Sequence, residues 1–403
     1  MGHLNDPVYI GAIALASIIF NIIYHGFSFL RMGSSGLTAQ AWGAKSHKEV
    51  SLVLIRSLIV AMGLAVMLIL FQYPIQWVSF KILDGSESVR ALAADYFYIR
   101  IWAAPATLGL YAFFGWFLGV QNAKYPMIIA LVINLVNIGL NFLFVIGFEM
   151  TSDGVALATV IAQYSGLALA IYFLTKKYRQ YITAYSLKII LKTEEIIRFF
   201  KVNTDIFIRT VLLLLVLAFF TNVSAKSSDD ILAVNTLLFQ FFFIFSYFAD
   251  GFAYAGEALT GKAYGAKNNK LLSITIKYLF YWGWGAAIVT SLVFFIGISP
   301  LMRILTNIPS LHEMAMNYRL WIIIIPLTST AAFIWDGIFI GVTASKGMRN
   351  AMIISSILIF LPAYYLTERS MGNNGLWFAL NLFMIARGLL MWIMWRRMKL
   401  PAS

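Results

Sequence analysis

Long apolar segments alternate with short polar stretches along the whole chain. A helix that crosses the hydrocarbon core of a membrane needs about 20 mostly apolar residues. By that criterion we expect eleven spans, five in the first half and six in the second, and therefore an all-α integral membrane protein. The expected spans are 8–33, 50–72, 93–120, 125–148, 154–175, 196–224, 231–258, 271–296, 315–344, 347–367 and 375–395.

The two halves of the chain repeat one another at a spacing of 222 residues. The segment from Leu37 to Lys45 aligns with the segment from Leu259 to Lys267, and six of the nine positions are identical. A later block keeps the same register, pairing Gly115, Phe117, Gly119, Val120 and Lys124 with Gly337, Phe339, Gly341, Val342 and Lys346. We therefore expect two pseudo-symmetric helical bundles.

The second copy is longer than the first at its front end. It opens with an apolar segment near Ile196, whose counterpart at a spacing of 222 would precede Met1. We expect a five-helix bundle over residues 1–178, a cytoplasmic linker over 179–195 and a six-helix bundle over 196–403. The linker is basic, and we expect a solvated connector, with contact to anionic lipid as the alternative.

Glycines and prolines are expected to interrupt the helices. The positions that fall near the predicted boundaries are Gly36, Pro74, Pro126, Pro300 and Gly375. The segment from Ile75 to Arg90 is amphipathic, so we expect it to lie along the membrane interface, as should its repeat partner after Pro300.

Composition agrees with a membrane protein. The chain is 61% hydrophobic and 12% charged, with a mean hydropathy of +0.81, whereas soluble proteins are about half apolar and about a quarter charged. It has no cysteine, so disulfides are not in use. The net charge of +13 fits basic residues collected in cytoplasmic loops. We expect the lipid bilayer as a partner and no nucleic acid.

Lysine and arginine are distributed unevenly between alternate loops. Fifteen lie on the side that includes Lys124, Arg349 and Arg396, and five lie on the side that includes Arg90 and Arg303. Because positive residues accumulate in cytoplasmic loops, the C-terminus is expected in the cytoplasm. The pattern predicts a multi-pass protein of the cell membrane.

Charged residues fall inside four predicted spans of the second half: Asp205, Asp250, Asp336 and Arg387. Each lies roughly 13 to 18 Å from the same end of its span, at about 1.5 Å per residue. An ionisable side chain costs several kcal/mol at such a depth and is usually functional. We expect a cation-coupling cluster here, with a static ion-pair network between helices as the alternative.

Two further charged residues neighbour these positions. Arg209 follows Asp205 at the i,i+4 spacing that brings side chains together on a helix. Glu257 lies seven residues after Asp250 on the same helical face. Glu257 either joins the cluster or meets the cytoplasmic headgroups.

The first half carries amides instead of deep carboxylates. Asn134, Asn137 and Asn141 share one face of a predicted span, with Thr159 and Gln163 on the next span as neighbours. Asparagines in membrane helices hydrogen-bond across to other helices. These residues are expected either to join helices or to line a substrate cavity.

Other chemistries find little support. The segment Gly256–Ala263 approaches a phosphate-binding loop, but that motif needs a preceding strand and Ser or Thr after the lysine, where Ala263 stands. No spacing of histidines suits a metal, and no nucleophile and base are paired. We expect no cofactor and no enzymatic activity.

Several motifs resemble a known family. Phe29–Gly33 followed by Gly36–Ala41 resembles the second helix of MATE (multidrug and toxic compound extrusion) transporters. Asn203–Arg209 and Asp250–Ala258 resemble the DNA-damage-inducible F (DinF) branch of that family. The resemblance implies two six-helix bundles around a central cavity, with drug efflux driven by an inward proton or sodium gradient.

The resemblance also bears on single positions. Asp205 and Asp336 stand where family members use acids on the seventh and tenth helices for cation binding, and some relatives carry Asp at the position of Asn141. Met1–Leu4 resembles residues that follow the family's first helix. We therefore expect that this sequence lacks that helix, together with the coupling aspartate it commonly carries.

The combined prediction is a monomeric secondary antiporter that exports small organic, often cationic, compounds by alternating access. The arginines near the acids favour protons over sodium as the coupling ion. A lipid-linked oligosaccharide flippase of related architecture is the first alternative, although its cavity should be rich in Lys and Arg. A channel or membrane scaffold is the second.

Overall fold

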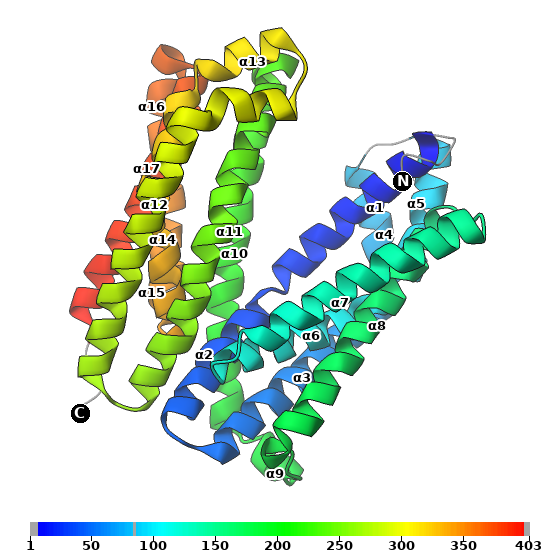
Figure 1. The fold of residues 1–403 in the computed structure, drawn as a ribbon, viewed down its shortest axis with the longest axis vertical. Coiled ribbons are helices and arrows are strands. Elements are labelled where there is room, and N and C mark those ends of the chain that lie inside the picture. The colour runs from blue at the N-terminus through cyan, green and yellow to red at the C-terminus, as the bar shows by residue number, and fades with distance from the viewer. Residues whose placement is uncertain (1–6, 84–85, 399–403) are drawn as a thin grey trace. The chain divides into compact units, whose positions relative to one another are not determined.

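The computed structural model describes residues 7–83 and 86–398, and in those ranges every regular element is a helix. Figure 1 shows the chain as long helices joined by short connections. Eleven helical stretches are long and apolar enough to cross a membrane, which confirms the predicted number. Met1–Leu4, which carried the expectation of a missing helix, lies outside the described residues.

The chain forms two compact units, which we call unit 1, up to Phe199, and unit 2, from Phe200 onward. The predicted bundle and linker boundaries remain predictions. The helices of unit 1 are α1 (Pro7–Gly26), α2 (Phe29–Gly43), α3 (His47–Leu70), α4 (Gln72–Ile82), α5 (Glu87–Arg100), η1 (Ile101–Ala103), α6 (Ala104–Gly119), α7 (Lys124–Asn141), η2 (Phe142–Gly147), α8 (Ser152–Lys177), η3 (Arg179–Tyr181) and α9 (Leu187–Ile190).

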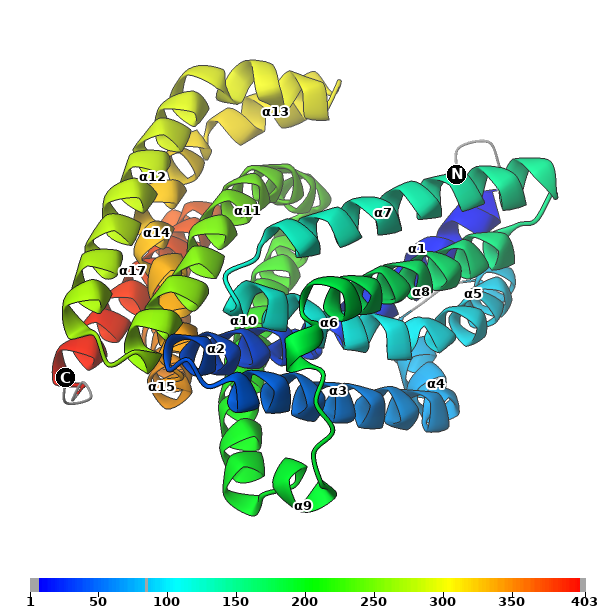
Figure 2. The ribbon, with the colours of Figure 1, turned by 60° about the horizontal axis from the view of Figure 1, so that its bottom comes forward.

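Unit 2 contains most of α10, which begins in unit 1, and the helices that follow. Their bounds are α10 (Thr193–Ser227), α11 (Asp229–Gly265), α12 (Asn269–Leu305), α13 (Pro309–Met316), α14 (Arg319–Gly341), α15 (Ser345–Ile353), η4 (Ile354–Phe360), α16 (Leu361–Met371) and α17 (Asn373–Arg397). Figure 2 shows α12, α14 and α17 side by side from a second direction.

Two expectations about helix breakers were wrong. Gly36 lies inside α2, and α12 continues through Pro300 to Leu305. Apolar surroundings favour a continued helix, because a backbone amide exposed there would lack a hydrogen-bond partner. Membrane helices tolerate proline and glycine because neighbouring groups satisfy the backbone groups that these residues leave free. The predicted amphipathic segment from Ile75 to Arg90 is also divided, since α4 ends at Ile82 and Arg90 belongs to α5.

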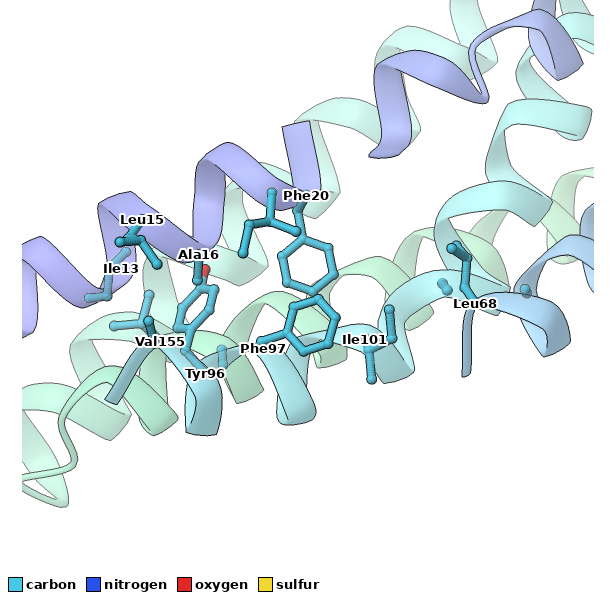
Figure 3. Close-up of a cluster of buried hydrophobic side chains, with 14 of the residues drawn as sticks. Ile13, Leu15, Ala16, Phe20, Leu68, Tyr96, Phe97, Ile101 and Val155 are labelled. Carbon is cyan, nitrogen blue, oxygen red and sulfur yellow. The ribbon is translucent and has the colours of Figure 1, made fainter. Parts of the chain in front are cut away.

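Unit 1 is held together by an apolar core between α1, α5 and α8 (Figure 3). Phe20 of α1 stacks on Phe97 of α5, with 5.2 Å between ring centroids. Ala16 of α1 and Val155 of α8 are buried in the same cluster. Such close packing of aromatic and small side chains supplies the dispersion contacts that hold membrane helices together.

The sequence repeat recurs as a packing repeat. Gly115 and Gly119 of α6 lie against α2, where an added Cβ would meet the Arg31 carbonyl and Thr38. Gly337 and Gly341 of α14 lie against the same positions of α11, namely Ala253 and Thr260, each displaced by 222 residues. Small residues four apart let helix backbones approach closely. Each unit therefore contains an equivalent, closely packed central helix pair, α2 with α6 in unit 1 and α11 with α14 in unit 2.

Helix ends also follow the repeat. Lys45 and Lys267 end their helices with positive φ values of 55° and 53°. Gln121 and Thr343, again 222 residues apart, have φ values of 66° and 53°. Thr343 is β-branched, so its left-handed conformation is strained. Thr343 keeps this disfavoured conformation, which indicates that the surrounding contacts fix the turn.

Candidate functional site

A buried cluster of one acid and two arginines joins three helices of unit 2, and we call it the Asp336 cluster. Asp336 of α14 accepts a hydrogen bond from Arg387 Nη2 of α17 at 2.7 Å. The same oxygen, Oδ2, is also contacted by Arg209 Nη2 of α10. The exposed fractions of Asp336 and Arg387 are 4% and 2%. The cluster therefore links α10, α14 and α17 in the interior.

Small residues beside these charges set their positions. Gly337 follows Asp336 and packs against the backbone of Ala253 on α11. Gly388 follows Arg387 and packs against Ala331 of α14. Because neither glycine has a side chain, α14 packs closely on both α11 and α17, and the approach to α17 brings Asp336 and Arg387 within contact.

Three buried atoms of the Asp336 cluster have no hydrogen-bond partner among the described residues. They are Oδ1 of Asp336 and Nε of Arg209 and Arg387. A buried polar atom without a partner is unusual and calls for an explanation. The cluster carries one carboxylate against two guanidinium groups, so it has spare donors as well as an imbalance of charge.

Asp205 forms a separate pair, which corrects the expected contact with Arg209. Its carboxylate accepts from Arg349 Nη1 at 2.6 Å and from Ser345 Oγ at 2.9 Å. Arg209 turns instead to Asp336. Residues four apart on a helix are close, but that spacing does not prevent each from pairing with a charge on another helix, as both residues do here.

Sequence reasoning missed Ser345 and Arg349 as partners, since Arg349 was assigned to a loop. Both lie on α15, which begins at Ser345. Their spacing of four residues places them on one helix face. That spacing was the signal available in the sequence, although it did not identify Asp205 as their partner.

The other two predicted acids lie on a different helix from Asp205 and Asp336. Asp250 and Glu257 both lie on α11, whereas Asp205 and Asp336 lie on α10 and α14. Glu257 has an exposed fraction of 1%, so its side chain does not reach the headgroups. Asp250 is only partly buried.

Unit 1 contains a polar pocket of about 350 Å³, which we call the unit 1 pocket. Three of the predicted cavity residues line it, namely Asn134, Thr159 and Gln163. Sequence reasoning missed the other polar lining residues: Asn21, Tyr24, His25, Arg100, Thr107 and Tyr111. Arg100 was detectable, because it is an ionisable residue inside a predicted span.

Of the remaining two asparagines, Asn137 joins two helices and Asn141 bonds to Asn137 on its own helix. Asn137 Nδ2 donates to Thr159 Oγ1 at 3.2 Å, which links α7 to α8. Asn141 Nδ2 donates to Asn137 Oδ1 at 3.0 Å. Neither asparagine lines the unit 1 pocket. The asparagine row is therefore divided, since Asn134 lines the pocket, Asn137 joins α7 to α8 and Asn141 supports Asn137.

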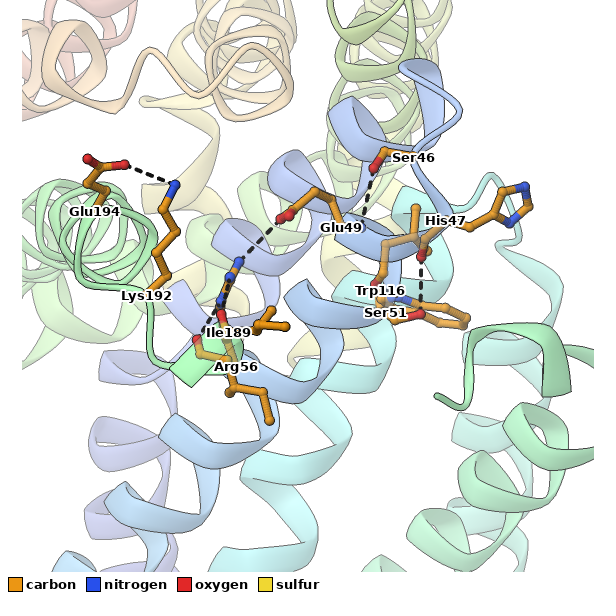
Figure 4. A network of polar contacts seen from close by, with 11 residues as sticks. Ser46, His47, Glu49, Ser51, Arg56, Trp116, Ile189, Lys192 and Glu194 are labelled. Carbon is orange, nitrogen blue, oxygen red and sulfur yellow. Dashed lines mark hydrogen bonds and ion pairs between the residues drawn. The ribbon is translucent and has the colours of Figure 1, made fainter. Parts of the chain in front are cut away.

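A third polar site anchors the basic linker to unit 1 (Figure 4). The buried Arg56 of α3 donates to the carbonyl oxygens of Ile190 at 3.0 Å and Ile189 at 3.3 Å, and it pairs with Glu49 at 3.3 Å. Tyr181 is also buried. The linker is thus mostly exposed, as expected of a connector, but it is attached at two points that the sequence did not reveal.

Comparison with known proteins relates this architecture to one family. A family model described as MatE matches residues 1–143 and 206–366. DNA damage-inducible protein F of Escherichia coli K12 is 35% identical over 398 residues, which are 98% of this chain and 86% of that protein.

Solved structures agree in fold. A mutant of the Vibrio cholerae MATE transporter VcmN has a TM-score of 0.85 at 19% identity, covering 96% of this chain and 88% of that one. A MOP superfamily transporter from Pyrococcus furiosus has a TM-score of 0.86 at 18% identity, covering 97% and 88%. These two likenesses concern the fold alone.

Proposed function

This chain belongs to the MATE family of multidrug and toxin extrusion transporters, and on that premise we propose that it exports small organic compounds in exchange for protons. Its relatives are membrane transporters and not enzymes. The exchange mechanism, the coupling ion, the monomeric state and a cytoplasmic C-terminus are parts of the proposal. The Asp336 cluster is the observation that carries it.

The Asp336 cluster is suited to convert a proton into a movement of helices. A proton on Asp336 would remove the charge that holds Arg209 and Arg387, and thereby loosen the link between α10, α14 and α17. Breaking a buried ion pair costs about 3 to 5 kcal/mol. A charge moving through 100 mV contributes about 2.3 kcal/mol, so the gradient supplies energy of a comparable size.

Return of the arginines to Asp336 would complete the cycle. Two guanidinium groups compete with one proton for the same carboxylate, and their return displaces the proton. We assign the Asp205–Arg349 pair to a supporting role, since Arg349 is more exposed than either arginine of the Asp336 cluster. Sodium is disfavoured because a guanidinium group already occupies each of these two carboxylates.

The unit 1 pocket is our candidate for substrate contact. Its volume of about 350 Å³ lies at the lower end of the range for small-molecule sites, about 300 to 1,000 Å³. Amide and hydroxyl groups of Asn134, Thr159 and Gln163 offer both donors and acceptors. Arg100 is present and no carboxylate is among the described lining residues, so we assign the pocket to an uncharged part of the substrate.

Transport by purified protein in vesicles tests the proposal. With an imposed pH gradient, the unmodified protein should concentrate a fluorescent organic cation, whereas Asp336→Asn should abolish concentration while still permitting binding. Asp230→Asn, at an exposed position near the start of α11, is the matched control and should transport normally. Unchanged transport by Asp336→Asn would rule out coupling at the Asp336 cluster, and unchanged transport by Asp205→Asn as well would rule out the Asp205–Arg349 pair.

The same assay separates the competing functions and ions. A sodium gradient without a pH gradient should not drive uptake. Passive equilibration without concentration would indicate a channel. If Asp336→Asn lowered the unfolding temperature but left coupled transport intact, the cluster would be a static ion-pair network and the coupling site would lie elsewhere.

A further inference from the structure

Unit 2 carries a cavity of about 890 Å³ between α12 and α17, with α14 as its floor, and we call it the aromatic groove. These three helices lie side by side in Figures 1 and 2. The groove is lined almost entirely by apolar side chains, and several are aromatic: Phe280, Trp284, Trp335, Trp392 and Trp395. It is distinct from the Asp336 cluster, which points to the interior of the unit.

The aromatic rings form a continuous wall. Trp335 lies 5.2 Å from Phe280 and 5.7 Å from Trp395, measured between ring centroids. These rings come from α12, α14 and α17, so one row of aromatic side chains spans all three helices. The groove is also open, since the exposed fractions of Leu389 and Trp392 are 51% and 43%. A ligand can therefore enter from the side without unfolding the unit.

Charge is confined to one end of the aromatic groove. Arg396 is the single charged residue among the described lining residues, and it is exposed. Its guanidinium group lies 5.3 Å from the ring centroid of Trp392. Arg397 follows it, and the exposed Lys277 follows the lining residue Ile276 on α12. The groove thus has an apolar length and a basic end.

The length of the groove fits one leaflet of a membrane. The lining residues of α17 extend from Ile385 to Arg396, which corresponds to roughly 16 Å at about 1.5 Å per residue. Half of the hydrocarbon core measures about 15 Å. Arg396 stands near the end of a predicted span, where a headgroup phosphate would lie.

We propose that the aromatic groove binds an acidic phospholipid, with an acyl chain along the aromatic wall and the phosphate at Arg396. Basic pockets between membrane helices commonly bind acidic headgroups. A lipophilic organic cation fits less well, because no carboxylate is among the described lining residues and Arg396 would repel it. The proposal is independent of the transport mechanism.

Lipid titration of the purified full chain tests the site. In native mass spectrometry, phosphatidylglycerol should be retained in preference to phosphatidylcholine. Arg396→Gln should weaken phosphatidylglycerol binding about five-fold, the factor expected for one basic residue near an acidic headgroup. Arg397→Gln removes the same charge from the neighbouring position, outside the groove lining, and should have little effect.

A second variant addresses the apolar part of the groove. Trp392→Ala should weaken retention of both lipids, whereas Trp282→Ala, at an exposed position of α12 outside the groove, should not. Equal losses in Arg396→Gln and Arg397→Gln would show diffuse surface attraction and overturn the proposal. So would equal retention of the two lipids, or displacement of phosphatidylglycerol by a lipophilic cation such as tetraphenylphosphonium.

Discussion

At the scale of single residues, the Asp336 cluster shows how a membrane interior handles charge. A buried carboxylate is stable only when its charge is matched and its oxygens are engaged. Asp336 receives two arginines from different helices, whereas Asp205 receives one arginine and a serine hydroxyl. Asp336 therefore links its helix to two others, α10 and α17, whereas Asp205 links its helix to α15.

Removal of the carboxylate alone should be more costly than removal of the carboxylate together with one arginine. Asp336→Asn should destabilise the protein by about 3 kcal/mol or more, because it leaves two buried guanidinium groups without a counter-charge. The double variant Asp336→Asn with Arg387→Met should recover part of that loss. Thermal unfolding in detergent, with Arg397→Gln as an exposed control on the same helix, measures both. Additive losses in the double variant would contradict the coupling.

At the scale of elements, the close helix pairs depend on four glycines in repeat register. We expect Gly337→Val and Gly115→Val to destabilise their units by about 1 to 3 kcal/mol or more, because the added atoms would meet the backbone of the facing helix. Gly285→Val and Gly139→Val are matched controls, since no atom lies within 4 Å of an added Cβ there. The yield of folded protein and its unfolding temperature measure the difference.

The anchored linker offers a second test at this scale. Arg56→Gln removes the donors to Ile189 and Ile190 and the pair with Glu49, so we expect faster proteolysis within residues 182–192. Lys192→Gln, which breaks only an exposed pair with Glu194, should leave the cleavage rate close to that of the unmodified protein. Equal rates in both variants would show that Arg56 does not hold the linker.

At the scale of the whole molecule, the repeat relates two units of different chemistry. Both contain the same central helix pair and the same turns at Lys45 and Lys267. The position of Asp336 corresponds to Phe114 in the first unit, and that of Arg387 corresponds to Ser165. The shared scaffold thus carries a charged cluster in unit 2 and an amide-lined pocket in unit 1.

Much of this molecule was predictable from the sequence. The span number and the approximate span bounds followed from apolar segment length, because only helices of that length satisfy the backbone within a bilayer. The position of Asp336 and Arg387 within long apolar helices was also predictable, because both fall inside predicted spans. The repeated glycines were visible in the sequence, but the helices on which they pack were not.

Partner choice was decided by the tertiary structure alone. Spacing along one helix favoured Asp205 with Arg209, but α15 brings Arg349 to Asp205 and leaves Arg209 to Asp336. The division of the asparagines between the unit 1 pocket and the contact of α7 with α8 likewise depends on helix rotation. The sequence by itself determined where each long apolar helix lies along the chain and which charges fall within it, because membrane thickness imposes a minimum length on each span. Which side chains meet depends on rotation and crossing between helices, and only packing in three dimensions sets those.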